Sequence, residues 1–187
     1  MAMSTKQEEI FKATFDVPPK VKLVLKKHML HVEGPLGKTY KNFKKIPVGL
    51  EVKDNKVTIT AINSRKKYHA IANTALSIIR TLCEGVVEGY TIKMKIVYAH
   101  FPITVKTKDK LVLVENFQGE RAPRTAKIHG TTKVTSKGDE VVVSGPVLQH
   151  VTQTAAEIQA NTKVKNKDHR VFLDGIYKFY KTKGIEK

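Results

Sequence analysis

Two segments of the chain combine basic side chains with turn-forming residues, a pattern suited to binding phosphate groups. The first segment is 116–124, NFQGERAPR, in which Gly119 predicts a turn. Arg121 and Arg124 then stand on a short loop or strand edge, where a planar guanidinium can bind a phosphate through two parallel hydrogen bonds. A hairpin turn with solvated arginines explains the same letters equally well.

The second segment, residues 163–183, reads KVKNKDHRVFLDGIYKFYKTK and joins charged groups to an apolar patch. Its basic and polar side chains come first, at Lys163, Lys165, Asn166, Lys167, His169 and Arg170. Its apolar side chains follow, at Val171, Phe172, Leu173 and Ile176. We expect this patch to dock the segment onto the second half of the chain, since apolar side chains favour burial. The basic groups would then be held in fixed positions, unlike those of a free basic tail.

The sequence offers no recognisable catalytic or metal-binding pattern. The carboxylates are scattered, with no pair at a spacing that suggests acid–base catalysis. His28 and His31 fall on opposite faces of an expected strand, and neither a His-Glu-x-x-His motif nor a Cys/His cluster occurs. We therefore expect no enzyme, no metal, no cofactor and no small-molecule substrate. The alternative, an enzyme, would need a cleft that gathers His100 or His129 with a carboxylate. We expect the single cysteine, Cys83, to be a small core residue.

Positive charge dominates the composition, with 34 Lys and Arg against 17 Asp and Glu and a net charge of +17. Residues 1–90 carry 16 basic and 8 acidic side chains and residues 91–187 carry 18 and 9, so both halves are basic. Because such charge destabilises a folded chain unless a polyanion screens it, we expect a nucleic-acid partner. Aromatic residues make up only 7%, without tryptophan, which favours contacts with backbone phosphates and folded RNA over base stacking.

The remaining composition indicates a folded chain inside the cell. With 41% hydrophobic residues in 187, a packed core is expected, and one cysteine excludes an internal disulfide. No run of eighteen apolar residues occurs, so we expect no membrane span. The N-terminal stretch MAMSTKQEEIF lacks the basic-then-apolar order of a secretory signal, so we expect an intracellular protein.

Hydrophobic alternation predicts strands in two groups, each followed by a helix. The expected strands cover residues 21–25, 29–33, 38–43 and 56–60, and then 103–108, 110–116, 132–136 and 140–144. Three- and four-residue spacing predicts a first helix over 65–83, capped by Asn63 and Ser64 and closed by Gly85 and Gly89. A second helix opens at Ser144-Gly145-Pro146 and fades near Asn161.

This repeated order predicts an internal duplication and an α+β fold. At an offset of 82 residues, Lys26, Val32, Glu33 and Gly37 match Lys108, Val114, Glu115 and Gly119. We expect two duplicated modules, residues 1–90 and 91–187, each a small antiparallel sheet packed with one main helix. The second module carries the basic C-terminal extension, and TIKMKIVYAHF is expected to form a long strand at its start.

Three strings carry a resemblance to a known family: VYAHFPI at 97–103, NFQGE at 116–120 and VKNKDHRVFLDGIY at 164–177. They resemble a universal family of large-subunit ribosomal proteins, the sixth in the bacterial naming and the ninth in the eukaryotic one. The resemblance covers essentially the whole chain and is to the archaeal or eukaryotic type. His169 and the ending KFYKTKGIEK depart from the family pattern.

The resemblance implies a structural role in the large subunit, without catalysis or cofactor. The second module and the C-terminal extension would dock on large-subunit rRNA near the translation-factor-binding region and the sarcin-ricin loop, with the first module towards the stalk base. Neighbouring large-subunit proteins are the other expected partners, in cytoplasmic ribosomes after nucleolar assembly if the source is eukaryotic. The matching positions give the RNA contacts as Asn116, Gln118, Gly119, Arg121, Arg124, Lys163, Lys165, Asn166, Lys167, His169, Arg170, Tyr177 and Lys178.

A second hypothesis is a free basic RNA chaperone or an architectural nucleic-acid-binding protein outside the ribosome. The composition fits it equally well, and only the motif resemblance separates the two.

Overall fold

The computed structural model describes residues 11–53 and 55–185, and its contacts divide the chain into two compact units. The first unit is Met1–Val87 and the second is Glu88–Lys187, against an expected boundary after residue 90. Residues 1–10, which carry the expectation of an intracellular protein, lie outside the described residues.

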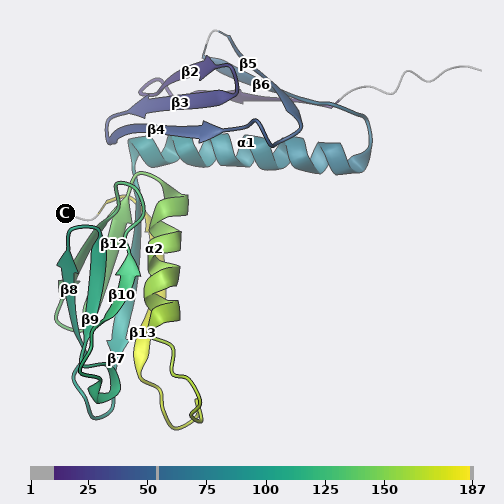
Figure 1. Cartoon of the computed structure of the whole chain (residues 1–187). Coiled ribbons are helices and arrows are strands. Elements are labelled where there is room, and N and C mark those ends of the chain that lie inside the picture. The colour runs from purple at the N-terminus through teal and green to yellow at the C-terminus, as the bar shows by residue number, and fades with distance from the viewer. Residues whose placement is uncertain (1–10, 54, 186–187) are drawn as a thin grey trace, which may run out of the picture. The chain divides into compact units, whose positions relative to one another are not determined.

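The first unit pairs two small antiparallel sheets with one long helix (Figure 1). Its elements are β1 (Lys12–Asp16), β2 (Lys22–Lys26), β3 (Met29–Gly34), β4 (Gly37–Asn42), β5 (Val48–Lys53), β6 (Lys56–Ala61) and α1 (Lys66–Val87). The strands are ordered β1-β6-β5 in one sheet and β2-β3-β4 in the other. Alternation places Val57 and Ile59 of β6 on the buried face, both fully buried.

By length and composition alone, α1 could cross a membrane. Its apolar stripe, however, packs on strands of its own unit, chiefly β6, β3 and β1. Ala72, Ala75, Ile79 and Cys83 are all fully buried in that contact. Burial raises the pKa of the Cys83 thiol to about 11, which keeps it protonated and unreactive. We therefore read α1 as the core helix of the first unit, and the expectation that Cys83 is a core residue is confirmed.

The second unit repeats this plan. Its elements are β7 (Tyr90–Val97), β8 (Thr104–Lys108), β9 (Leu111–Glu115), a 3₁₀ turn η1 (Phe117–Gly119), β10 (Arg124–Lys127), β11 (Lys133–Lys137), β12 (Glu140–Gly145), α2 (Leu148–Asn161) and β13 (Gly175–Lys183). One sheet is ordered β10-β9-β8 and the other β11-β12-β7-β13. Figure 1 shows α2 lying along the strands of this unit.

The strand orders confirm the expected α+β fold with duplicated sheet-and-helix modules. The order β1-β6-β5 of the first unit corresponds to β7-β12-β11 of the second, and β2-β3-β4 corresponds to β8-β9-β10. Each module thus has two small sheets where one was expected. Within the described residues, β13 has no counterpart in the first unit, and it pairs with the free edge of β7.

Helix α1 ends later than expected, and helix α2 begins later than expected. α1 runs on through Gly85, which is buried inside it, and Gly89, with a φ of 79°, follows the last helical residues. The expected cap of the second helix at Ser144-Gly145-Pro146 is wrong, because Ser144 pairs with β7 and β11 and Val147 occupies the N-cap position. The expected end of α2 near Asn161 is confirmed.

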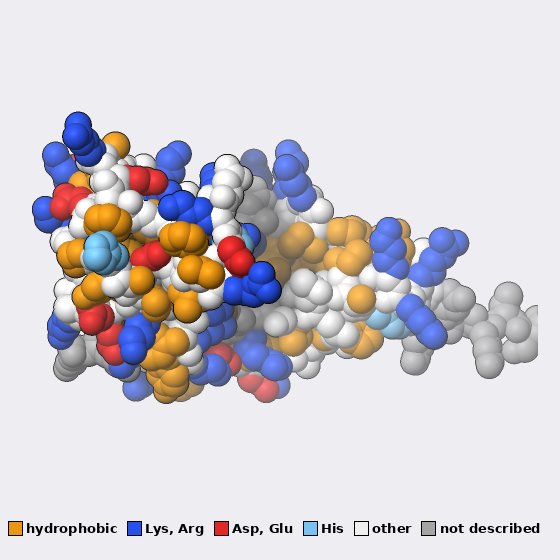
Figure 2. Space-filling view, turned by 90° about the horizontal axis from the view of Figure 1, so that it is seen from below, with side chains coloured by type: hydrophobic (Ala, Val, Ile, Leu, Met, Phe, Trp, Pro, Cys, Tyr) orange, Lys and Arg blue, Asp and Glu red, His pale blue; other side chains and the backbone are white. Residues whose placement is uncertain are grey.

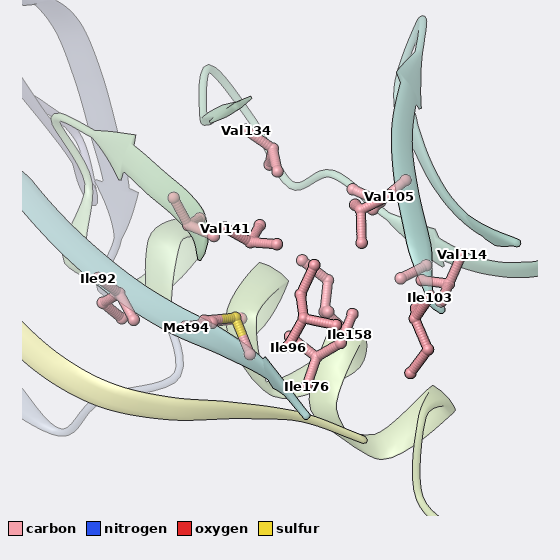
Figure 3. Packing of buried hydrophobic residues seen from close by; sticks show 14 of the residues in the cluster. Ile92, Met94, Ile96, Ile103, Val105, Val114, Val134, Val141, Ile158 and Ile176 are labelled. Atoms are coloured by element: carbon pink, nitrogen blue, oxygen red, sulfur yellow. The ribbon is translucent and has the colours of Figure 1, made fainter. Parts of the chain in front are cut away.

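A single hydrophobic cluster holds the second unit together (Figure 3). It gathers Ile92, Met94 and Ile96 from β7 with residues of β8, β9, β12 and α2. Val164 and Ile176 also belong to it, at 2% and 0% exposure. Because these two residues bracket the chain between α2 and β13, the core anchors both ends of the basic segment.

Ile176→Ala should therefore destabilise the second unit substantially. Removing a fully buried isoleucine leaves a cavity among residues that cannot all move, so the free energy of unfolding should fall by about 2–5 kcal/mol. Ile185→Ala is the matched control, since Ile185 is 38% exposed and should lose less than about 1 kcal/mol. Urea titrations measure both, and equal losses would contradict the anchoring role of Ile176.

Candidate nucleic-acid interface

The two basic segments predicted from the sequence meet at Arg124. Its Nε and Nη2 atoms donate to the two carboxylate oxygens of Glu120, at 2.8 and 2.6 Å. Its Nη1 atom donates to the backbone oxygens of Asn161 at 2.8 Å and Lys163 at 3.3 Å. The Asn161 side chain returns a bond to the Thr125 oxygen at 2.7 Å. The loop before β10 and the chain after α2 are thus tied together, and Figure 1 places both at one end of the second unit.

Arg124 is a positioning residue in this geometry. Its guanidinium lies 4.0 Å from the centroid of the buried Phe117 ring, and its side chain is only 23% exposed. All three of its nitrogen atoms have acceptors within the chain. Arg121, by contrast, is exposed and has no ion-pair partner among the described residues. Of the two predicted arginines, Arg121 is therefore the more accessible to a phosphate.

The turn between β9 and β10 has an unusual backbone. Asn116, Gln118 and Gly119 have φ angles of 59°, 52° and 78°, so the turn expected at Gly119 is confirmed and two other residues share its left-handed conformation. Such values are strained for residues with a side chain and persist only where the surroundings hold them. The Asn116 amide donates to the Pro102 oxygen at 3.0 Å, and Phe117 is 1% exposed. These two contacts fix the turn on the core.

The segment after α2 presents its basic groups outward. Val164 faces the core, while the neighbouring basic side chains are exposed: Lys163, Lys165, Lys167, His169 and Arg170. Arg170 holds Asp168 through Nε–Oδ1 and Nη2–Oδ2 hydrogen bonds of 3.2 and 3.0 Å, which lower the pKa of that carboxyl group. With its side chain 90% exposed, Arg170 can exchange this partner for a phosphate. Asn166, with a φ of 59°, turns the chain between the lysines.

The expected apolar docking patch is wrong for three of its four residues. Val171, Phe172 and Leu173 are 69%, 38% and 57% exposed, and only Ile176 is buried. The segment is anchored at its two ends instead, so its middle projects from the unit. Asp174, 7% exposed, adds a tie by accepting the Ala99 N–H at 3.0 Å. Figure 2 looks onto this end, where basic side chains border hydrophobic ones.

The two remaining predicted contacts lie on β13. Tyr177 is 41% exposed and its ring rests against Gly175, where an added Cβ atom would approach two ring carbons to 2.9 Å. Lys178 is exposed on the same strand, opposite Met94 in the register. Tyr177 also lines a groove with Lys163 and His169, so the structure brings a subset of the predicted residues around one hollow.

The feature required by the enzyme hypothesis is present only as a structural pair. His129 Nε2 and Glu157 Oε1 are 2.7 Å apart. The backbone N–H groups of His129 and Lys127 also donate to α2, to Thr154 Oγ1 at 3.0 Å and to Glu157 Oε2 at 3.3 Å. The pair therefore fastens the chain after β10 to α2. Among the described residues, no group of three or more His, Cys, Asp and Glu side chains could hold a metal ion.

This pair predicts a pH dependence of stability. The hydrogen bond from His129 is the main cause that lowers the pKa of Glu157 below its ordinary value of 4.5. A carboxyl group whose pKa is lower in the folded state stabilises the fold above its unfolded pKa, and this contribution disappears as the pH falls through the folded pKa. The Tm difference between wild type and Glu157→Gln should therefore shrink as the pH falls below 4.5. Thermal melts from neutral to acid pH check it, and a constant difference would contradict the pair.

Sequence reasoning missed the residues that position the site. Glu120, Phe117, Asn161 and Asp174 were not singled out, although they hold the basic segments in place. Only Glu120 left a local signal, since it stands four residues before Arg124. The contacts of Asn161 and Asp174 join residues 36 and 75 positions apart, and the stacking of Arg124 on Phe117 depends on the fold of the turn between them.

Known proteins similar to this chain agree on one family. The sequence profile of the family described as Ribosomal protein L6 matches residues 101–175. The large ribosomal subunit protein uL6 of Methanosarcina mazei is 43% identical over 88% of this chain and 93% of its own length. The proteins of the same name from Archaeoglobus fulgidus and Candida albicans are 38% and 42% identical, over 94% and 87% of this chain and 92% and 89% of their own. The chain therefore belongs to the ribosomal protein L6 family, in agreement with the resemblance of its three sequence strings.

Proposed function

We propose that the chain is a structural constituent of the large ribosomal subunit and binds folded large-subunit rRNA mainly through its second unit. The observation that carries this proposal is the Arg124 cross-link, which ties the loop 116–124 to the start of the segment 163–170, so that both basic segments lie at one end of the second unit. The names of the relatives, all large-subunit proteins, support the same role.

In this mechanism, exposed cations on an ordered frame neutralise RNA phosphates and release their counterions. The exposed lysines and arginines of this surface are Arg121, Lys163, Lys165, Lys167 and Arg170. Contacts to phosphates and 2′-hydroxyls carry little sequence information, so recognition rests mainly on the shape of the folded RNA. Because Arg124 and the core anchors fix the segments beforehand, less conformational entropy is lost on binding.

Family membership supports the finer placement of this surface. It would lie near the translation-factor-binding region and the sarcin-ricin loop, with the first unit towards the stalk base and neighbouring large-subunit proteins. The role requires no catalysis and no cofactor. The protein would act in cytoplasmic ribosomes, after nucleolar assembly in a cell with a nucleus.

Binding of the purified full chain to large- and small-subunit rRNA, measured over a series of salt concentrations, tests this proposal. We expect large-subunit rRNA to bind at least about tenfold more tightly, with an affinity that falls steeply with salt. Equal affinity for both RNAs would support a free RNA chaperone instead. Tighter binding to duplex DNA would support an architectural DNA-binding protein.

A further inference from the structure

A groove of about 560 Å³ lies on the second unit where α2 ends and β13 begins. Six of its lining residues matter for its chemistry: Gln159, Thr162, Lys163, His169, Ile176 and Tyr177. They come from the last turn of α2, both ends of the basic segment and the start of β13. The groove therefore opens beside the basic surface defined above.

The floor of the groove is formed without any ligand. Ile176 is fully buried and Thr162 is 1% exposed. The Thr162 hydroxyl accepts the N–H of Ile176 at 3.2 Å and donates to the Ile158 oxygen at 2.9 Å. Through these two hydrogen bonds, one hydroxyl group fixes the start of β13 against the end of α2. The core therefore sets the distance between the two walls of the groove.

The aromatic wall is also held in place. The Tyr177 ring lies over Gly175, where an added Cβ atom would stand 2.9 Å from two of its carbons and 3.0 Å from its hydroxyl. The Tyr177 hydroxyl donates a long hydrogen bond of 3.5 Å to the backbone oxygen of Asp174. Gly175 needs no unusual φ, so it is the close approach of the ring that requires glycine here. A ring fixed in this way and still 41% exposed can stack on a flat ligand.

The other walls supply the polar chemistry of a nucleotide site. Lys163 provides a cation, and the exposed Gln159 amide provides both a donor and an acceptor for the edge of a base. Among the residues that the structure describes, no Asp or Glu lines the groove, and Lys165 and Lys167 follow on the adjoining segment. A hollow with one aromatic face, one amide and only positive charge is complementary to a single nucleotide of a polyanion.

We infer that this groove holds one unpaired nucleotide of the bound RNA, with its base against Tyr177 and its phosphate at Lys163. The inference rests on the proposed function. It adds base stacking at one point to a surface that otherwise contacts the sugar–phosphate backbone of the RNA. Unpaired bases in RNA loops and bulges are the ones that stack on aromatic side chains, whereas paired bases are inaccessible.

The test compares variants of the full chain for binding to large-subunit rRNA. Tyr177→Ala should weaken binding about tenfold, and Tyr177→Phe should bind like the wild type, because the ring does the stacking. Tyr180→Ala is the matched control, since Tyr180 is 50% exposed on the same strand but outside the groove. Lys163→Ala should reduce the slope of log affinity against log salt by about one, whereas Tyr177→Ala should leave that slope unchanged.

Chemical probing of the bound RNA identifies the nucleotide directly. One unpaired base should be protected by the wild type and by Tyr180→Ala, and exposed with Tyr177→Ala. Gly175→Ala, which displaces the ring, should expose the same base, and it decides the result if Tyr177→Ala fails to fold.

Unchanged protection with both groove variants, or equal losses of affinity for Tyr177→Ala and Tyr180→Ala, would overturn the inference while rRNA binding itself stands. Loss of retention in assembled subunits with unchanged rRNA affinity would also overturn it, in favour of a protein segment as the occupant. A wild-type chain that does not distinguish large-subunit rRNA would contradict the proposed function itself.

Discussion

A chain with both Arg121→Ala and Arg170→Ala is expected to bind large-subunit rRNA about 100-fold more weakly than the wild type, since each lost charge-assisted contact is worth about 1.4 kcal/mol. Both side chains are exposed, and they lie on the two segments that Arg124 brings together. Neither is buried in the core, so the variant should unfold like the wild type. Each single change should weaken binding about tenfold.

Lys53→Ala provides the control from the first unit. Lys53 is 80% exposed and its only ion pair among the described residues is a long one, 3.7 Å to Glu51. Its removal takes away one charge without touching the proposed surface, so affinity should change by less than about threefold. Equal losses from Arg121→Ala, Arg170→Ala and Lys53→Ala would contradict the placement of the interface in the second unit.

Arg124→Met is expected to lower both stability and rRNA affinity, since all three nitrogen atoms of Arg124 already bond within the chain. The change removes the bonds to Glu120, Asn161 and Lys163 together. Because the side chain is still 23% exposed, water replaces part of the loss, and we expect the free energy of unfolding to fall by about 2 kcal/mol. Affinity should fall about tenfold, because the two basic segments are no longer held side by side.

Lys106→Ala is the matched control for this change. Lys106 forms a 2.7 Å ion pair with Glu115 on the neighbouring strands, but its side chain is 60% exposed. Its removal should alter stability by less than about 1 kcal/mol and leave affinity nearly unchanged. Urea titration and RNA binding measure both variants. An Arg124→Met chain that unfolds like the wild type would show that the cross-link does not order the surface.

Local patterning was sufficient to predict the two strands with the most deeply buried inner faces, β6 and β12. β6 and β12 place Val57, Ile59, Val141 and Val143 in the core at every second position, and all four are fully buried. β1, β5, β10 and β13 were not predicted. β10 has only four residues, which is too short for an alternating pattern to stand out. β1 and β5 do alternate, with apolar residues on their half-buried inner faces, so the pattern was present there and was overlooked.

β13 was missed for a different reason. After Ile176 almost all of its side chains are exposed, because it lies at the edge of its sheet. Its register with β7 also shifts between Lys178 and Tyr180. Such a bulge changes which face each following residue points to, so the alternation that predicts a strand is lost.

The site was predicted by residue type and not by role. The charged and turn-forming residues were enough to single out both basic segments. They gave Arg121 and Arg124 the same predicted role, that of a phosphate contact. The difference arises from Asn161 and Lys163, which lie 37 and 39 residues away and accept bonds from Arg124 only in the folded chain. Similarly, the apolar side chains of Val171 and Leu173 predict burial. Both are exposed, because the chain is anchored in the core on either side of them, at Val164 and Ile176.

Sedimentation of the tagged chain from cells through a sucrose gradient, after a wash at roughly 0.5 M salt, tests the central claim most directly. Each fraction is probed for the chain and for both rRNAs. Near-stoichiometric retention on large subunits is the predicted result, because a surface ordered by Arg124 and the core should withstand the loss of weak phosphate contacts. A chain found mainly in the free fractions, or released together with bulk RNA, would contradict the ribosomal role.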